Sequence, residues 1–132
     1  MLCGITNVIL HNIQVSALGE SDTVHIFAGS TKIWVDHVTS FEAKLGLVSV
    51  LQGSTDVTIS NSHLSNFNFN MLLGASDNDK EDEDMRVTVY RNWFKDSMQR
   101  MPHCRSISTH YDHFFKSMSK VHNVTQCHYG VL

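Results

Sequence analysis

The sequence predicts an all-β protein, a parallel β-helix built as a single-stranded solenoid of about five coils. A short apolar strand followed by a polar corner recurs along the chain, at Asn7–Asn12, Lys32–His37, Asp56–Asn61 and Arg86–Asn92. The leading apolar residues of these segments are about 24 to 30 residues apart, a spacing typical of stacked repeats. Because one such coil cannot bury its apolar face alone, neighbouring coils must stack.

The strand segments predict a layered core with polar corners. The leading apolar residues are expected to form one column: Val8, Ile33, Val57 and Val87. Further apolar stretches at 23–27, 47–53 and 71–74 fit a second strand in each coil, and Gly, Ser, Thr and Asp between strands suit tight corners. At the corners, the following residues are expected to stack and cap backbone groups with their amides: Asn12, Asn61 and Asn92.

Residues 1–132 are expected to form one partial domain. The strand pattern ends near residue 105, and 106–132 is a divergent tail, too short for a core of its own. The first strand begins close to Met1, with no basic flank and no apolar signal segment before it, which taken literally indicates a cytosolic protein. We favour the alternative, a chain that starts inside a longer protein and leaves the β-helix incompletely capped. If it folds alone, we expect a monomer whose open strand edges favour aggregation.

Composition excludes several classes of partner. The formal net charge is -3 and no basic stripe runs along the chain, so nucleic acid and a membrane surface are poor candidates. No apolar run approaches the roughly 20 residues needed to cross a bilayer. The sequence has three cysteines and no CxxC motif: Cys3, Cys104 and Cys127. Buried or unreactive thiols are favoured. The alternative is a disulfide between Cys104 and Cys127, if the chain is secreted.

Five segments in order, NVILHNI, IWVDH, GSTDVTIS, MLLGASD and QRMPHCR, resemble plant-type pectate lyases of polysaccharide lyase family 1. The resemblance covers about residues 6–105 and implies a right-handed β-helix. It also implies a secreted or cell-wall protein that acts on polygalacturonate or pectin. Enzymes of this family cleave de-esterified homogalacturonan by β-elimination, with Ca²⁺ neutralising the uronate carboxylate so that the C5 proton can leave.

The resemblance assigns roles to four residues. Arg100 falls on the arginine described as the catalytic base of the family, and Arg105 on an arginine that binds the substrate carboxylate. Asp22 falls on an aspartate that ligates calcium, and Glu20 could share the cation because alternate residues of a strand point the same way. An acidic corner facing water is the alternative for this pair. His103 stands where plant members carry arginine, which makes the local charge depend on pH.

Three departures from the family pattern weaken the expected site. The usual DGLVDV segment reads LGLVSV here, so two acidic ligands become Leu45 and Ser49. The usual lysine before MLLG becomes Phe69. Calcium needs six to eight oxygen ligands, so its affinity should fall steeply. Glu42 could restore a ligand only if the alignment slipped, and the acidic run Asp77–Asp84 is expected to be a solvated corner.

The nine histidines do not show HxxxH or HExxH spacing, so the sequence predicts no histidine metal site. Asp36 and His37 are expected to be structural parts of the stack. Two functions therefore remain open: a pectate lyase with impaired activity, or a non-catalytic uronate-binding or vestigial β-helix. The two arginines favour the first function, whereas Leu45, Ser49 and Phe69 favour the second.

Overall fold

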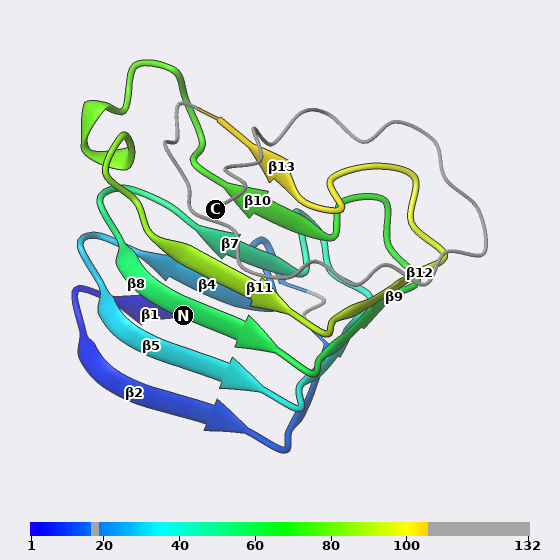
Figure 1. Ribbon diagram of the computed structural model, residues 1–132. Coiled ribbons are helices and arrows are strands. Elements are labelled where there is room, and N and C mark those ends of the chain that lie inside the picture. The colour runs from blue at the N-terminus through cyan, green and yellow to red at the C-terminus, as the bar shows by residue number, and fades with distance from the viewer. Residues whose placement is uncertain (17–18, 106–132) are drawn as a thin grey trace.

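The computed structural model describes residues 1–16 and 19–105 as a stack of parallel strands (Figure 1). One 3₁₀ turn, η1 (Lys80–Asp82), is the single helical element in that part of the chain. The strands are β1 (Leu2–Cys3), β2 (Thr6–His11), β3 (Gln14–Ser16), β4 (Val24–Phe27), β5 (Thr31–Asp36), β6 (Thr39–Phe41), β7 (Val48–Val50), β8 (Thr55–Ser60), β9 (His63–Ser65), β10 (Met71–Leu73), β11 (Val87–Tyr90), β12 (Trp93–Lys95) and β13 (His103–Cys104).

The strands form three sheets, and each coil of the chain contributes one strand to each sheet. Sheet A has the order β1-β4-β7-β10-β13, sheet B the order β11-β8-β5-β2, and sheet C the order β12-β9-β6-β3. Every strand pairing is parallel. The predicted parallel β-helix is therefore confirmed, with four coils and the first strand of a fifth among the described residues.

The predicted core column is also confirmed. Val8 pairs with Ile33, Ile33 with Val57, and Val57 with Val87, so the four side chains lie above one another. The last three are 1% exposed, and Val8 packs against the same core from the outermost strand of sheet B. Since side chains alternate along a strand, this column fixes which residues of each neighbouring strand point outward.

Serine side chains connect the coils at the corner between sheets A and B. The Ser30 hydroxyl accepts a bond from the N–H of Ile5 at 3.2 Å, and the Ser30 N–H donates to the Ser54 hydroxyl at 3.1 Å. Both serines are fully buried. The corner therefore satisfies its buried backbone donors from the neighbouring coil, because an unpaired buried N–H would be costly.

The asparagine ladder differs from the prediction. In register, the corner between sheets B and C stacks Asn12, His37, Asn61 and Arg91, all with positive φ of 54°, 50°, 48° and 53°. Asparagine tolerates this left-handed conformation better than most residues, which explains its recurrence. Asn92 instead lies one residue further on, where its amide accepts from the N–H of Ser62 at 2.9 Å. The same amide also donates to the carbonyl of Ile59 at 2.7 Å.

The acidic run is not simply a solvated corner. Asp82, in η1, is fully buried, and its Oδ1 accepts a hydrogen bond from the N–H of Gly53 at 2.7 Å. Gly53 has a φ of 72°, so it needs glycine, and it lies in the turn of the preceding coil. Asp82 therefore fastens the acidic loop to the turn below it, which corrects the expectation for that residue.

No helix in the described part of the chain is long and apolar enough to cross a membrane. Cys3 is exposed as a free thiol. The expected tail, together with Cys127, lies outside the described residues.

Replacing Asp82 tests whether the acidic loop is fastened to the stack. Asp82→Ala leaves the Gly53 N–H without its acceptor, so the free energy of unfolding should fall by about 1–3 kcal/mol. Asp84→Ala, at an exposed position of the same loop, should change it by less than about 0.5 kcal/mol. Urea denaturation of both variants measures the difference, and equal losses would show that the Asp82 contact is not stabilising.

Candidate functional site

Asp22 and Phe69 each lie two residues before a strand of sheet A, where their coils enter that sheet. The N–H of Thr23 donates to the carbonyl of Gly46 at 3.1 Å. One coil further on, the N–H of Leu47 donates to the carbonyl of Phe69, also at 3.1 Å. Phe69 in turn pairs with Gln99. The register thus stacks Asp22, Gly46, Phe69 and Gln99, residues that are far apart in the sequence.

Asp22 has a specific environment on this face. Its Oδ2 accepts a hydrogen bond from the Ser49 hydroxyl. The same oxygen lies 3.3 Å from Nδ1 of His25, without the alignment of a hydrogen bond. A Cβ added to Gly46 would lie 2.7 Å from Oδ1 of Asp22, so only glycine allows this close approach. The Asp22 carboxylate is 11% exposed and is held against the neighbouring coil.

His25 is a contact that the sequence analysis missed. It pairs with Ser49 across β4 and β7, between the inward residues Val24 and Ile26. The alternation in TVHIF could have placed His25 on the outer face, since its apolar neighbours mark the inner one. It could not have shown that the His25 ring lies against Asp22.

Glu20 and Asp22 have separate partners. Glu20 is 89% exposed and pairs with Lys44 at 2.9 Å. Glu42 is exposed, and Leu45 is 54% exposed at the start of the segment that leads into β7. Leu45 offers no oxygen, and the ligands expected from the family pattern do not surround Asp22.

Arg100 lies against Phe69, which ties the arginine to the same column. Its guanidinium carbon is 4.3 Å from the centroid of the Phe69 ring, within the range of a cation–π contact. Nε of Arg100 is buried and has no hydrogen-bond partner. The backbone carbonyl of Arg100 accepts from the N–H of Met71 at 2.7 Å, which fixes the segment on the sheet.

Arg105 lies beyond the other end of β13. Its Nη1 donates to the carbonyl of Ala75 at 2.9 Å, and its Nε lies 4.0 Å from Oδ1 of Asp77. His103 lies between the two arginines in sequence and pairs with Leu72. Burial lowers the pKa of His103, the positive charges of Arg100 and Arg105 lower it further, and Asp77 opposes them.

The donor set around Asp22 does not fit calcium. Among the described residues it supplies one carboxylate and the Ser49 hydroxyl, with a histidine nitrogen alongside. Calcium takes six to eight oxygen ligands and usually several carboxylates. Leu45 offers no oxygen and Ser49 offers a neutral one, whereas the family pattern has a carboxylate at each of these positions.

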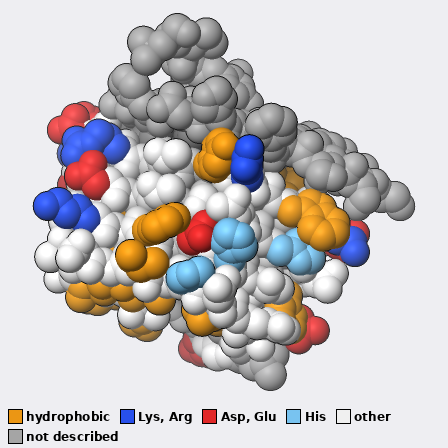
Figure 2. Space-filling view, turned by 60° about the horizontal axis from the view of Figure 1, so that its bottom comes forward, with side chains coloured by type: hydrophobic (Ala, Val, Ile, Leu, Met, Phe, Trp, Pro, Cys, Tyr) orange, Lys and Arg blue, Asp and Glu red, His pale blue; other side chains and the backbone are white. Residues whose placement is uncertain are grey.

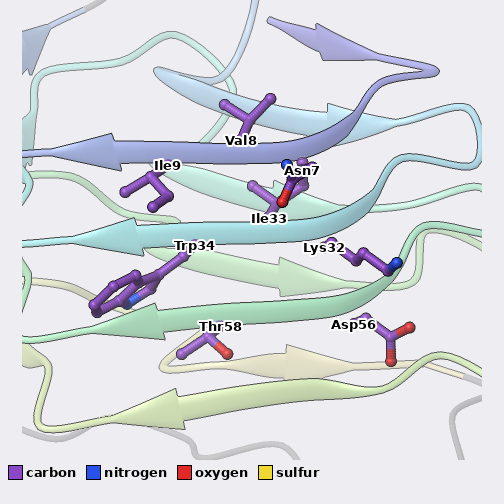
Figure 3. A pocket seen from close by; sticks show the side chains of 8 residues that line it. All are labelled: Asn7, Val8, Ile9, Lys32, Ile33, Trp34, Asp56 and Thr58. Carbon is purple, nitrogen blue, oxygen red and sulfur yellow. The ribbon is translucent and has the colours of Figure 1, made fainter.

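A hollow of about 370 Å³ lies on sheet B, away from these residues (Figure 3). Trp34 is 44% exposed and borders it together with Ile9, and Lys32 and Asp56 lie at its other end. The hollow includes none of the predicted site residues. This hollow and the predicted site residues Asp22, Arg100 and Arg105 are therefore in different parts of the molecule.

Comparison with known proteins decides the family. The profile of the pectate lyase family matches residues 1–129. The chain belongs to the pectate lyase family. A pectate lyase from Lilium longiflorum is 51% identical over 78 residues, which is 58% of this chain and 18% of the lily protein.

Solved structures agree with this family and fold. A variant pectate lyase from Xanthomonas campestris superposes with a TM-score of 0.77 at 25% identity, covering 91% of this chain and 43% of that one. The cedar pollen allergen jun a 1 gives a TM-score of 0.72 at 31% identity, covering 83% and 39%. The chain spans less than a third of the length of the curated pectate lyases it matches.

The lowered pKa of His103 predicts the sign of a pH effect. The usual histidine pKa is 6.5, so the unfolded chain binds this proton more readily than the folded chain. The stability contributed by neutral His103 is complete above about pH 6.5 and is lost as the pH falls through the folded pKa.

His103→Gln should therefore reduce the loss of unfolding free energy between about pH 7.5 and pH 5. The loss should not vanish, because burial also lowers the pKa of His63 on sheet C. Urea denaturation at several pH values measures this slope. An unchanged slope in the variant would contradict the assignment.

Proposed function

We propose that the outer face of sheet A binds uronate units of de-esterified homogalacturonan, and that Ca²⁺-dependent β-elimination by this chain is impaired. One observation carries the proposal: Asp22 is bonded to the Ser49 hydroxyl at a position where the family pattern has a second carboxylate. A calcium ion held there would lack most of its protein oxygens. Secretion to the plant cell wall, where this polymer occurs, is part of the same proposal.

The arginines support the binding half of the proposal. The Arg100 guanidinium lies on the ring of Phe69 with its Nε buried, and because the residue is only half-buried, the rest of the side chain can meet a ligand. Arg105 is exposed, and its other donors can reach outward. Guanidinium groups bind carboxylates bidentately, and a polyuronate presents one carboxylate per sugar.

Phe69 changes what Arg100 can do. A guanidinium is protonated at neutral pH and is a poor base without a strongly perturbed setting. The family pattern has a lysine at the position of Phe69, whereas here an aromatic ring supports the arginine and offers no charge to the substrate. The arrangement therefore favours binding of carboxylate over removal of a proton.

The alternative function is a non-catalytic uronate-binding or vestigial β-helix. The exposed Leu45 and the separate pairing of Glu20 with Lys44 favour it. The two functions differ in one measurable property, because only a residual enzyme yields the unsaturated product from polygalacturonate. That product absorbs ultraviolet light, so its formation with and without excess Ca²⁺ separates them.

Restoring the two missing carboxylates tests the calcium argument. Leu45→Asp with Ser49→Asp adds two carboxylates near Asp22, so Ca²⁺ affinity should rise by orders of magnitude. Without Ca²⁺ the same variant should be less stable than the parent, since like charges then lie together. Calorimetric titration with Ca²⁺ and thermal unfolding with and without the ion measure both effects. Leu45→Asn with Ser49→Asn is the matched control, with similar volume and no added charge.

Activity should return less fully than calcium binding, because Phe69 still offers no charge. Adding Phe69→Lys should raise turnover of polygalacturonate further, and adding Arg100→Ala should abolish the gain. Arg86→Ala is the control for loss of an arginine, since Arg86 pairs with Asp56 next to sheet B. If the rebuilt chain binds Ca²⁺ no better than the asparagine control, the assignment of Leu45 and Ser49 is wrong.

A further inference from the structure

A second polar cluster lies on sheet B and does not depend on the proposed uronate site. His11 ends β2 and pairs with Asp36, which ends β5, and His37 follows Asp36 at the corner. Each residue offers one ligand atom, and these three atoms lie within 4.8 Å of one another. Figure 2 shows histidine side chains beside an acidic side chain on the molecular surface.

The Asp36 carboxylate is held in a fixed orientation. Its Oδ1 accepts hydrogen bonds from the Ser60 hydroxyl at 2.6 Å and from Nδ2 of Asn61 at 2.8 Å. Its Oδ2 lies 2.6 Å from Nδ1 of His37. Burial raises the pKa of Asp36, but the bonds from Ser60, Asn61 and His37 outweigh it and bring the pKa to about 2. The group is therefore an oriented carboxylate at neutral pH.

The two imidazoles are accessible from solvent. The His37 side chain is 57% exposed at a corner with a φ of 50°, and His11 is exposed on the neighbouring strand. The centroids of the two rings are 6.3 Å apart, with 56° between their planes. Small rotations of exposed rings can therefore adjust their nitrogens around the anchored Asp36.

We propose that His11, Asp36 and His37 form a binding site for a divalent transition-metal ion of the Zn²⁺ class. Two imidazoles and one carboxylate match the ligands that zinc takes at sites with an open fourth position. Zn–N bonds of about 2.0–2.1 Å place tetrahedral donors roughly 3.4 Å apart. Here Nδ1 of His37 is 2.6 Å from Oδ2 of Asp36, and all three ligand atoms lie within 4.8 Å of one another, so small side-chain rotations bring them to this spacing. A metal bound to Nδ1 of His37 takes the place of the hydrogen bond between that nitrogen and Oδ2 of Asp36, and the neutral ring then carries its proton on Nε2.

This site selects a different metal from the one the family pattern suggests for sheet A. Nitrogen donors suit zinc, copper and nickel, whereas calcium prefers oxygen alone. The sequence predicts structural roles for Asp36 and His37, and its histidines do not have the spacing of a helical zinc motif. The parallel register places His11 beside Asp36, so the ligands come together through strand pairing and not through a short sequence motif.

Trp34 is a local reporter for this site. Its Nε1 donates at 2.9 Å to the Ser60 hydroxyl, which itself donates to Asp36. The sequence has two tryptophans, so Trp93→Phe leaves Trp34 as the single emitter. Cu²⁺ bound beside Trp34 should then quench its fluorescence, whereas Cu²⁺ bound to distant histidines should not.

The test is titration of the full chain carrying Trp93→Phe with Cu²⁺, and displacement of the Cu²⁺ by Zn²⁺. Saturable quenching is expected, and adding His11→Ala and His37→Ala should weaken it by roughly tenfold or more. His103→Gln, which removes a histidine from sheet A, should leave the quenching unchanged. Zn²⁺ should also raise the thermal midpoint of the parent but not of the double-alanine variant.

Both alanine changes are at exposed positions, and circular dichroism checks that the variants remain folded. Equal quenching curves in the parent and the double-alanine variant would overturn the proposal. Absence of saturable quenching in the parent would overturn it too. Asp36→Asn is a less clean variant, because this side chain is buried and also bonds to Ser60 and Asn61.

Discussion

The in-register stacking of parallel coils is the constraint on which the rest of this structure depends. Each residue lies directly over its counterpart one coil away, as Val8, Ile33, Val57 and Val87 show. A shift of one residue would turn every inward side chain outward, so the apolar column fixes the register strongly. The buried serines at the corner between sheets A and B strengthen that register, because they bond the N–H groups of the neighbouring coil.

The same register determines which chemical groups meet on the outside. On sheet A it places Asp22 over a glycine and beside Ser49, and it places Phe69 under Arg100. A substitution in one coil therefore changes the surroundings of a residue in the next. On sheet B the register brings His11 to Asp36. The register therefore brings different polar groups together on two faces of the solenoid.

The sequence was sufficient to predict the fold, the core column and the departures at Leu45 and Ser49. The fold and the core column follow from the spacing of apolar residues. The departures follow from the side chains themselves, because leucine has no oxygen and serine has no carboxylate. The prediction for Asn92 was wrong because the asparagine that follows each strand does not mark the register. Tyr90 pairs with Ser60, so Arg91 lies over Asn61, and Asn92 lies one position further along. The contacts of Asp82 with Gly53 and of Asp22 with His25 depend on side-chain directions, which periodicity does not define.

The most direct test of this account is a calorimetric titration of the unmodified chain with Ca²⁺, followed by incubation with polygalacturonate. The account predicts no saturable binding at micromolar Ca²⁺, since Asp22 has a hydroxyl partner in place of a second carboxylate. It also predicts little or no unsaturated product. Micromolar Ca²⁺ binding together with rapid formation of that product would contradict it.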